Sequence, residues 1–420
     1  MKSIYSLLCV LLCAMLAFGS CVDDDKDLSD PSKKPTTDLN IPEDFSWEST
    51  QAVKLSITSP SAATASFYCD AACTAESQIG VLPVSAGENT FTFDLPFSQE
   101  AVYVQYAKTD GTTETVESKI KKTVTRAVET DNVIFIEPEL SHANFSINIP
   151  HSGGYGTIMF EDTWPNTEDY DFNDVVVNYK INCVASTNSP HNIDIHVSLK
   201  IRALGGTLPY NFAMQFGTWT SGGIDFRIPA SDMVGVSDVK STNSNIDVVA
   251  LNTQHPAIEV TGLNSLRKPG YYNTVSKEDD GVQVDFTVTI KGTEDEQLQR
   301  ITSGFLDQKA FDYFLRHENG REIHMRGFAP TSLYADQYEK DVQGKGGKYY
   351  YQNNKGLVWG LKAPAEIGWP AEKKDITTVY YRFAGWVESG GSEIGDNPHL
   401  LIWYDYYTSN NYIDSNNKKK

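Results

Sequence analysis

The sequence predicts a mainly β protein, with a small N-terminal immunoglobulin-like β-sandwich followed by a larger β-rich domain with one or two helices. Two observations support this prediction: apolar residues alternate in short runs along most of the chain, and turn-prone clusters separate these runs. Alternation with a period of two is typical of strands with one buried face. The 420 residues are enough for two or three domains. We expect a signal peptide over residues 1–20, an acidic flexible tether over 21–44, the sandwich over 45–128 and the larger domain over 129–415.

The first twenty residues have the composition of a signal peptide. Lys2 precedes an apolar run over residues 4–18, which is shorter than the roughly 20 residues that a membrane span requires. A small Gly-Ser pair then precedes Cys21, as at sites where a cysteine thiol is lipidated and becomes the new N-terminus. We therefore expect Cys21 to hold a lipid, the alternative being ordinary cleavage with Cys21 as a bystander.

Residues 22–44 contain few apolar side chains and cannot bury enough surface to fold alone, so we expect them to form the tether. The segment Val22-Asp23-Asp24-Asp25 resembles the acidic signal that directs lipoproteins of Bacteroidota to the outer face of the outer membrane. This resemblance implies a protein that is anchored in the outer membrane and faces the cell exterior. The formal charge of −20 argues against nucleic acid as a partner, since its binding requires Lys and Arg at the phosphates.

The sandwich is predicted from alternating apolar runs after residue 45. The clearest runs are Val53, Leu55, Ile57; Phe91, Phe93, Leu95; and Val102, Val104, Tyr106. The polar segment 119–130 is the expected domain boundary. Three cysteines remain beyond Cys21, namely Cys69, Cys73 and Cys183; free thiols are favoured, and a Cys69–Cys73 pair would need a turn between the two.

Further strand-like runs follow the boundary, at residues 133–136, 145–149, 175–181, 193–201 and 282–290. Two helices are expected among them. The clearer one covers residues 375–389, where apolar residues recur at helical spacing, Asp375 can cap the start and Gly390-Gly391 can end it. The second lies between residues 294 and 315.

An acidic segment over residues 160–174 is the most informative part of the sequence. Asp162, Asp169, Asp171, Asn173 and Asp174 crowd oxygen-bearing side chains into a short stretch. Such crowding is unfavourable unless a cation shares the oxygens, and Ca²⁺ accepts six to eight of them in flexible geometry. We therefore predict a calcium site at these five residues, completed by Glu161 or by a distant loop. The alternative is that these acids cap turns and accept hydrogen bonds from backbone amides.

Three motifs stand out in the same segment: Phe160-Glu161-Asp162, Trp164-Pro165 and Asp169-Tyr170-Asp171-Phe172-Asn173-Asp174, followed by a β-branched strand. Together they closely resemble the signature of the LruC-domain lipoproteins, which are common in Bacteroidota. Later stretches resemble further landmarks of that family, among them Glu322-Ile323-His324, Trp359-Gly360-Leu361 and Trp369-Pro370-Ala371-Glu372. The resemblance covers about residues 130–415. It implies a membrane address and an architecture, because the activity of the family is itself largely uncharacterised.

No arrangement of residues typical of a known catalytic site is present in the sequence, and the eight histidines form no recognised metal motif. We therefore expect a non-enzymatic, calcium-stabilised module that binds or adheres to an extracellular protein or glycan. The alternative is an extracellular hydrolase or a glycan-binding component of a polysaccharide-use system. Aromatic residues near the C-terminus could stack on sugars, with Trp403, Tyr404 and Tyr406 as candidate contacts.

Overall fold

The computed structural model describes residues 34–121, 127–141, 144–186, 190–218, 220–221, 224–267, 270–392 and 400–414. Its fold is mainly β with few helices, which confirms the predicted fold class. The predicted signal peptide and Cys21 lie outside the described residues. Within the described ranges, no helix is long and apolar enough to cross a membrane.

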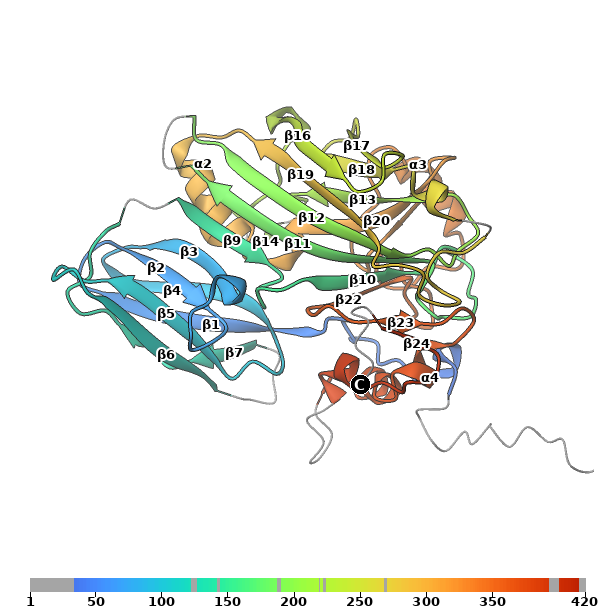
Figure 1. The fold of residues 1–420 in the computed structure, drawn as a ribbon, viewed down its shortest axis with the longest axis horizontal. Helices are drawn as coiled ribbons and strands as arrows, with labels where there is room; N and C mark the ends of the chain where they lie inside the picture. The colour runs from blue at the N-terminus through green and yellow to red at the C-terminus, as the bar shows by residue number, and fades with distance from the viewer. Residues whose placement is uncertain are drawn as a thin grey trace, which may run out of the picture.

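The N-terminal domain contains two β-sheets, coloured blue to teal in Figure 1. One sheet pairs β1 with β4, β7 and β8, and the other joins β3, β2, β5 and β6. The ring of Phe67 on β2 lies 5.1 Å from that of Phe93 on β4, so the inner faces of the two sheets meet in one core. The strands are β1 Thr50–Ser59, β2 Ala63–Tyr68, β3 Gln78–Val84, β4 Gly87–Pro96, β5 Ala101–Ala107, β6 Thr113–Lys121, β7 Ala127–Thr130 and β8 Val133–Ile134.

This domain extends beyond the predicted boundary. Residue 128 lies inside β7, which pairs with β1 and β6. Further along, Phe135 stacks on Tyr106 with ring centroids 3.9 Å apart, and the backbone N–H of Ile136 donates to the Tyr106 hydroxyl at 3.0 Å. The boundary prediction was therefore wrong by several residues, because the described parts of the polar segment 119–130 are strands. Cys69 and Cys73 are both free thiols, as predicted.

The larger domain has two sheets of its own (Figure 1). The first has the order β16-β19-β12-β11-β9, with β10 on the same edge of β11 as β9 and β22 beyond β10. The second has the order β17-β18-β13-β20-β21. Their strands are β9 Phe145–Ile149, β10 Gly156–Phe160, β11 Val175–Ala185, β12 Ile193–Ala203, β13 Tyr210–Phe216, β16 Met233–Ser241, β17 Asp247–Ala250, β18 Ala257–Thr261, β19 Val282–Ile290, β20 Phe311–His317, β21 Glu322–His324 and β22 Gly360–Ala363. Two short pairs complete the β structure: β14 Thr220–Ser221 with β15 Ile224–Asp225, and β23 Trp369–Pro370 with β24 Tyr412–Ile413.

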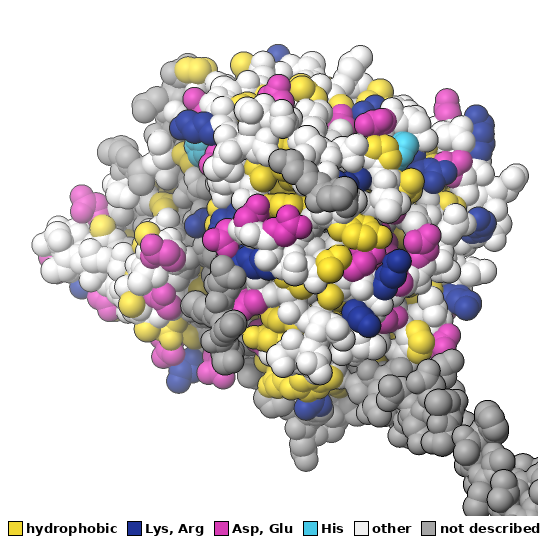
Figure 2. Space-filling view, turned by 45° about the vertical axis from the view of Figure 1, so that its right-hand side comes forward, with side chains coloured by type: hydrophobic (Ala, Val, Ile, Leu, Met, Phe, Trp, Pro, Cys, Tyr) yellow, Lys and Arg dark blue, Asp and Glu magenta, His cyan; other side chains and the backbone are white. Residues whose placement is uncertain are grey.

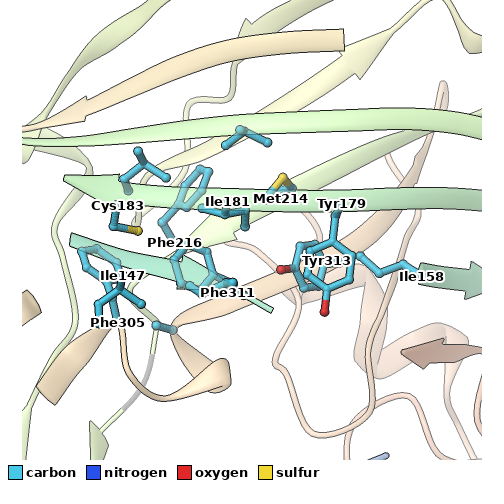
Figure 3. Close-up of a cluster of buried hydrophobic side chains, with 14 of the residues drawn as sticks. Ile147, Ile158, Tyr179, Ile181, Cys183, Met214, Phe216, Phe305, Phe311 and Tyr313 are labelled. Carbon is cyan, nitrogen blue, oxygen red and sulfur yellow. The ribbon is translucent and has the colours of Figure 1, made fainter. Parts of the chain in front are cut away.

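These two sheets pack against each other around a large apolar core, part of which is drawn in Figure 3. Tyr179 of β11 and Tyr313 of β20 lie side by side there, with ring centroids 5.2 Å apart. The start of β11 is buried on both faces, because Val175 and Val177 enter this core while Val176 enters a second one. A continuous β-branched run is typical of a strand covered on both sides.

The two domains are joined by a pair of strands. β3 of the sandwich pairs antiparallel with β9 of the larger domain, with Gly80 opposite Ile147. A Cβ atom on Gly80 would lie 2.4 Å from the carbonyl oxygen of Ser146, so only glycine permits this close approach. One hydrogen-bonded sheet therefore continues from the first domain into the second.

The second core lies beneath the C-terminal helices and differs from the prediction there. The expected helix over residues 375–389 is two helices, α4 Ile376–Val379 and α5 Phe383–Glu388. The chain leaves the helical conformation at Tyr380, whose buried hydroxyl donates to the Gly368 carbonyl at 2.7 Å. Asp375 does cap the start, accepting from the Thr377 N–H. This tertiary hydrogen bond accompanies the break that periodicity alone did not show.

The other predicted helix is also shorter than expected. α2 covers Glu294–Gln299 and continues as a π-helical turn over Arg300–Gly304, after which the chain enters strand β20. Thr293 and Glu296 form a capping box at its start. A further short helix, α3, covers Ala335–Asp341.

The last part of the predicted tether is packed rather than free. Thr36 is wholly buried, and its N–H and hydroxyl donate to the Asp375 carboxylate at 2.7 and 2.8 Å. Leu39 is buried in the second core, and Lys34 forms an ion pair with Glu388 at 3.1 Å. The tether prediction was therefore wrong for residues 34–44. Their few apolar side chains form no core of their own, but the larger domain covers them.

Candidate metal centre

The acidic segment forms the loop between β10 and β11. These strands are antiparallel neighbours, with Phe160 opposite Val175. Glu161 and Asp162 therefore leave the sheet beside the point at which Asp174 enters it. The backbone N–H of Asp162 donates to the Asp174 carboxylate at 2.7 Å, which closes the loop.

Inside the loop the backbone is tightly turned. Tyr170 and Phe172 have φ of +50° and +52°, in the left-handed region, so residues 169–173 are not an extended strand. Both rings are buried in the second core. The N–H of Phe172 donates to the Glu161 carboxylate, and the N–H of Lys373 donates to the Asp171 carboxylate at 2.7 Å. The buried rings and these hydrogen bonds hold the acids in place.

Three carboxylates converge in this loop. Each of Glu161, Asp169 and Asp171 offers an oxygen that lies within 4.8 Å of those of the other two. Glu161 and Asp171 are each only 2% exposed, and Asp169 is half-buried. We call these three residues the acidic trio. None of them forms an ion pair with Lys or Arg in the part of the chain that the structure describes.

Ionisation of the acidic trio is unfavourable, because its carboxylates are close together and two of them are buried. Burial, together with the charges of Asp174 and Asp171, raises the pKa of Glu161 well above its ordinary value. Burial and the neighbouring Asp169 raise the pKa of Asp171 to about 8. Buried carboxylates at such short distances cannot all ionise unless a positive charge is shared between them. A divalent cation would supply that charge.

Asp162 and Asp174 form a separate pair beside the trio. Burial raises the pKa of Asp162 to about 6, and the N–H of Leu208 and the guanidinium of Arg267 oppose this rise. Burial and the charge of Asp162 raise the pKa of Asp174 well above its ordinary value. Arg267 therefore supplies this pair with a nearby positive charge from the chain itself.

Asn173 is wholly buried, and it is not one of the three residues whose oxygens converge. Its amide nitrogen donates to the Pro370 carbonyl at 3.1 Å, and its Oδ1 has no hydrogen-bond partner among the described residues. A Cβ on Gly205 would lie 1.8 Å from this Oδ1, and one on Gly206 would lie 2.0 Å from Asp162 Oδ2. The oxygens of Asn173 and Asp162 therefore face the same glycine pair, where only backbone without side chains fits.

Among the predicted calcium residues, Asp169 and Asp171 come together in the trio. Asp174 pairs with Asp162 and also lies near enough for its charge to raise the pKa of Glu161. Glu161, which sequence reasoning named only as a completing ligand, is a full member of the trio. One signal could have identified Glu161: it follows β10 directly, and β10 pairs with β11, the strand that begins after Asp174. Three carboxylates offer up to six oxygens, which fits the preference of Ca²⁺ for oxygen ligands.

A second group of buried acids lies on β20 and β21. His324 Nδ1 is 2.6 Å from Asp312 Oδ2, and its Nε2 is 3.0 Å from Glu322 Oε2. All three side chains are wholly buried. Thr331 donates its N–H and its hydroxyl to the Glu322 carboxylate at 2.9 and 2.7 Å. We call Asp312, Glu322 and His324 the histidine network.

The histidine network contains its own positive charge. Burial alone would lower the pKa of His324, but Asp312 and Glu322 raise it to about 9. Burial raises the pKa of Asp312 to about 6, against the opposing effect of His324. The imidazole ring also stacks on Phe314, with centroids 4.2 Å apart. This arrangement is enclosed by side chains and leaves both ring nitrogens occupied.

The predicted glycan contacts at the C-terminus are wrong for two of the three residues. Trp403 is 0% exposed and Tyr404 only 3%, since both pack in the second core. Tyr406 is half-buried and lies edge-on to Tyr381, with centroids 5.9 Å apart. The ring of Trp403 packs against Phe383 and Trp386 of α5, and Tyr404 packs edge-on to Trp403, so neither ring can stack on a sugar.

The fold and the loop define a two-domain protein built from β-sheets, with an acid-rich loop at the edge of the larger domain. Residues 191–396 match a family model described as a domain of unknown function (DUF4842). A solved structure from Bacteroides ovatus, described as a "putative lipoprotein", is similar with a TM-score of 0.62 and 20% identity; the match covers 84% of this chain and 99% of that one. At this identity the likeness shows a shared fold.

A second solved structure is the full-length major pilin SpaD from Corynebacterium diphtheriae. It is 10% identical, with a TM-score of 0.18, over 66% of this chain and 64% of that one. No structural argument follows from so low a score. No curated protein matches this chain.

Proposed function

We propose that this chain is a lipid-anchored protein of the outer membrane, facing the cell exterior, whose larger domain is stabilised by Ca²⁺ at Glu161, Asp169 and Asp171. It binds or adheres to an extracellular partner and has no catalytic activity of its own. The observation that supports the calcium site is the acidic trio, which buries converging carboxylates without an ion pair to Lys or Arg among the described residues. A buried amide oxygen of the same loop, Asn173 Oδ1, has no hydrogen-bond partner among the described residues, although it faces Gly205 and not the trio.

The address is supported by the sequence before the fold. The signal-like segment, the position of Cys21 and the acidic stretch after it fit a surface lipoprotein. Similarity in fold to a protein described as a putative lipoprotein agrees with this address. The motifs around Asp169 and Asp171 also resemble the LruC-domain lipoproteins, and we propose membership of that family.

Two features support a binding role: the charge of the surface and the closed state of the histidine network. The face drawn in Figure 2 mixes acidic and basic side chains, with acidic groups gathered near its middle, and it shows no broad basic surface. The histidine network is closed to solvent and offers no group to a substrate.

The calcium proposal is tested on the lipid-free chain from residue 22 onward. After treatment with chelator and dialysis, thermal unfolding is followed with added Ca²⁺, with added Mg²⁺ and with neither. We expect Ca²⁺ to raise the melting temperature and Mg²⁺ to have a much weaker effect, because three close carboxylates suit the larger ion. At a hundredfold excess over Kd, a single site adds about 2.7 kcal/mol. Identical melts in all three conditions would reject the calcium site.

The anchor is tested separately in cells. Labelled palmitate should be incorporated into the full-length chain and should disappear in Cys21→Ala. The matched control is Cys69→Ala, which removes a thiol that the structure places in the folded sandwich. Incorporation that survives Cys21→Ala would reject lipidation at this residue.

A further inference from the structure

A polar pocket lies apart from the acidic loop and has no assigned role. Its volume is about 640 Å³, within the range of roughly 300–1,000 Å³ that is typical of small-molecule sites. Its walls come from the segment before β1, the ends of β13 and β18, and the turn after β21. It shares no residue with the acidic trio or with the Asp162–Asp174 pair. The pocket is thus built from the larger domain and from the segment that precedes the sandwich.

One wall of the pocket holds a fixed guanidinium. Arg326 lies over the ring of Tyr349, with 3.8 Å from its central carbon to the ring centroid. Its Nη1 donates to the Ser46 carbonyl at 3.4 Å. Its Nε is buried, so a ligand in the pocket meets the other end of the guanidinium. Stacking fixes the plane of the guanidinium, and a fixed cation of this kind is suited to bind a carboxylate.

Charge at the pocket is positive on balance, in a chain with a formal charge of −20. Lys309 and Arg326 line it against a single acid, Glu48. Lys309 is exposed, and neither cation forms an ion pair with Asp or Glu within the described ranges. His255 also lines the pocket, and its Nδ1 is 2.8 Å from the Ile228 carbonyl. A ligand with one negative charge fits this balance, whereas a polyanion would meet the acidic remainder of the molecule.

The rest of the lining is mixed. Amide and hydroxyl groups come from Gln215, Gln254, Thr218 and Ser332, and the rings of Tyr349 and Phe328 add apolar surface. Hydroxyl groups of a sugar pair with amides and hydroxyls, while the apolar face of its ring packs on an aromatic side chain. A metabolite without hydroxyl groups would leave these polar groups unpaired.

We propose that this pocket binds an acidic saccharide, that is, a sugar unit with a carboxylate such as a uronic or sialic acid. Arg326 and Lys309 bind the carboxylate, the polar wall binds the hydroxyls, and Tyr349 and Phe328 contact the ring. This inference rests on the proposed role as a surface binding module and supplies its ligand class. It does not depend on calcium, because the pocket and the acidic trio share no residue.

The proposal is tested by calorimetric titration of the lipid-free chain. The probes are galacturonate and N-acetylneuraminyl-lactose, each with one carboxylate, and the matched neutral sugars are galactose and lactose. We expect at least one acidic sugar to bind at least tenfold more tightly than its neutral match. Equal binding of the acidic and neutral sugars would overturn the proposal, and so would no binding of either acidic sugar up to about 10 mM.

Variants then locate the site. Arg326→Gln should weaken binding of the acidic sugar by at least tenfold and Lys309→Gln by several-fold, with little change for the neutral sugar. Lys309 is exposed, so its replacement leaves the fold intact even if Arg326→Gln proves unstable. Lys355→Gln, at an exposed cation outside the pocket, is the control and should not change binding. Unchanged affinity in Lys309→Gln and in folded Arg326→Gln would place the sugar elsewhere.

The two proposals fail in different measurements. The calcium-dependent melt reports the acidic trio, and the titrations report the pocket. Titrations repeated after removal of calcium should give the same affinity for the acidic sugar wherever the protein remains folded. Absence of a calcium effect with intact saccharide binding rejects only the calcium site. A calcium effect without saccharide binding rejects only the pocket's ligand.

Discussion

Buried carboxylates occur in two regions of this protein, and the two regions neutralise them differently. On β20 and β21, Asp312 and Glu322 share the ring of His324 between them. In the loop before β11, the acidic trio converges without an ion pair to Lys or Arg among the described residues. The histidine network is wholly buried, and in the acidic trio Glu161 and Asp171 are buried while Asp169 is half-buried. One contains a cation of its own, and the other has the composition of a site that accepts one from outside.

Strand register explains the difference. Phe314 is opposite His324 across β20 and β21. Side chains two residues apart in a strand lie on the same face. Asp312 therefore lies on the face of Phe314, and Glu322 lies on the face of His324. The sheet therefore brings an imidazole and two carboxylates together without strain. The loop has no such register, and the charge of Arg267 acts on the Asp162–Asp174 pair. The sheet thus supplies its own counter-charge, whereas in the loop we propose that a bound ion supplies it.

The largest effect is expected from removing the internal cation. His324→Leu removes the cation that Asp312 and Glu322 share in a buried site, and breaking a buried ion pair in this way typically costs about 3–5 kcal/mol. Urea unfolding of the lipid-free chain measures the loss. His196→Gln, at an exposed position of β12, is the control; it keeps a polar side chain beside the Thr287 hydroxyl, 3.0 Å from His196 Nδ1, and should change stability by less than about 0.5 kcal/mol. A loss in His324→Leu no greater than in the control would show that the carboxylates are protonated and do not need His324.

The next effect concerns the external cation. Asp171→Asn removes one carboxylate from the acidic trio, so the gain of about 2.7 kcal/mol expected at a hundredfold excess of Ca²⁺ should largely vanish. Without calcium, the variant should be at least as stable as the unmodified chain, because one repulsive charge is gone. Thermal melts with Ca²⁺ and with chelator measure both quantities.

Glu88→Gln is the control for this variant, because it removes an exposed acid from the sandwich. It should retain the full response to Ca²⁺. If Asp171→Asn responds to Ca²⁺ as strongly as Glu88→Gln does, the ion binds away from the trio, and the comparison between the two buried groups no longer holds.

Much of the fold was predictable because it depends on local periodicity. The predicted strand over residues 282–290 coincides with β19, and Asp375 caps a helix as expected. The histidine network was not predictable, because His324 meets Asp312 only through the pairing of β20 with β21. The sequence around His324 shows a lone histidine, and no local pattern encodes strand register.

The acidic trio was predictable only in part, because it too depends on strand pairing as well as on local sequence. Asp169 and Asp171 are close in sequence and come together, whereas Glu161 joins them through the pairing of β10 with β11. Trp403 was misplaced because an aromatic residue looks the same in sequence whether it fills a core or faces solvent. The pocket around Arg326 is built from segments far apart in the chain and had no signal at all.

The internal cation should also make stability depend on pH. The pKa of His324 is about 9 in the folded protein, against an ordinary value of 6.5. A raised pKa means that the charged ring stabilises the fold fully below pH 6.5, and that this stabilisation is lost as pH rises through about 9. The gap in unfolding free energy between the unmodified chain and His324→Leu should therefore narrow from pH 6.5 to pH 9.5. A constant gap would mean that His324 contributes by packing rather than by charge.

The smallest effect is expected at Arg267, a cation of the chain itself that acts on acids beside the acidic trio. Its Nη1 donates to the Leu208 carbonyl at 2.7 Å, and its charge acts on Asp162 and Asp174. Arg267→Gln should lower stability by about 1–2 kcal/mol without calcium, as for the loss of a hydrogen bond from a charged group. With Ca²⁺ the loss should shrink, because an ion nearby can replace part of the missing charge. Arg267→Lys keeps the charge and should lose less; if it loses as much as Arg267→Gln, Arg267 contributes through geometry alone, and the loop contains no counter-charge of its own.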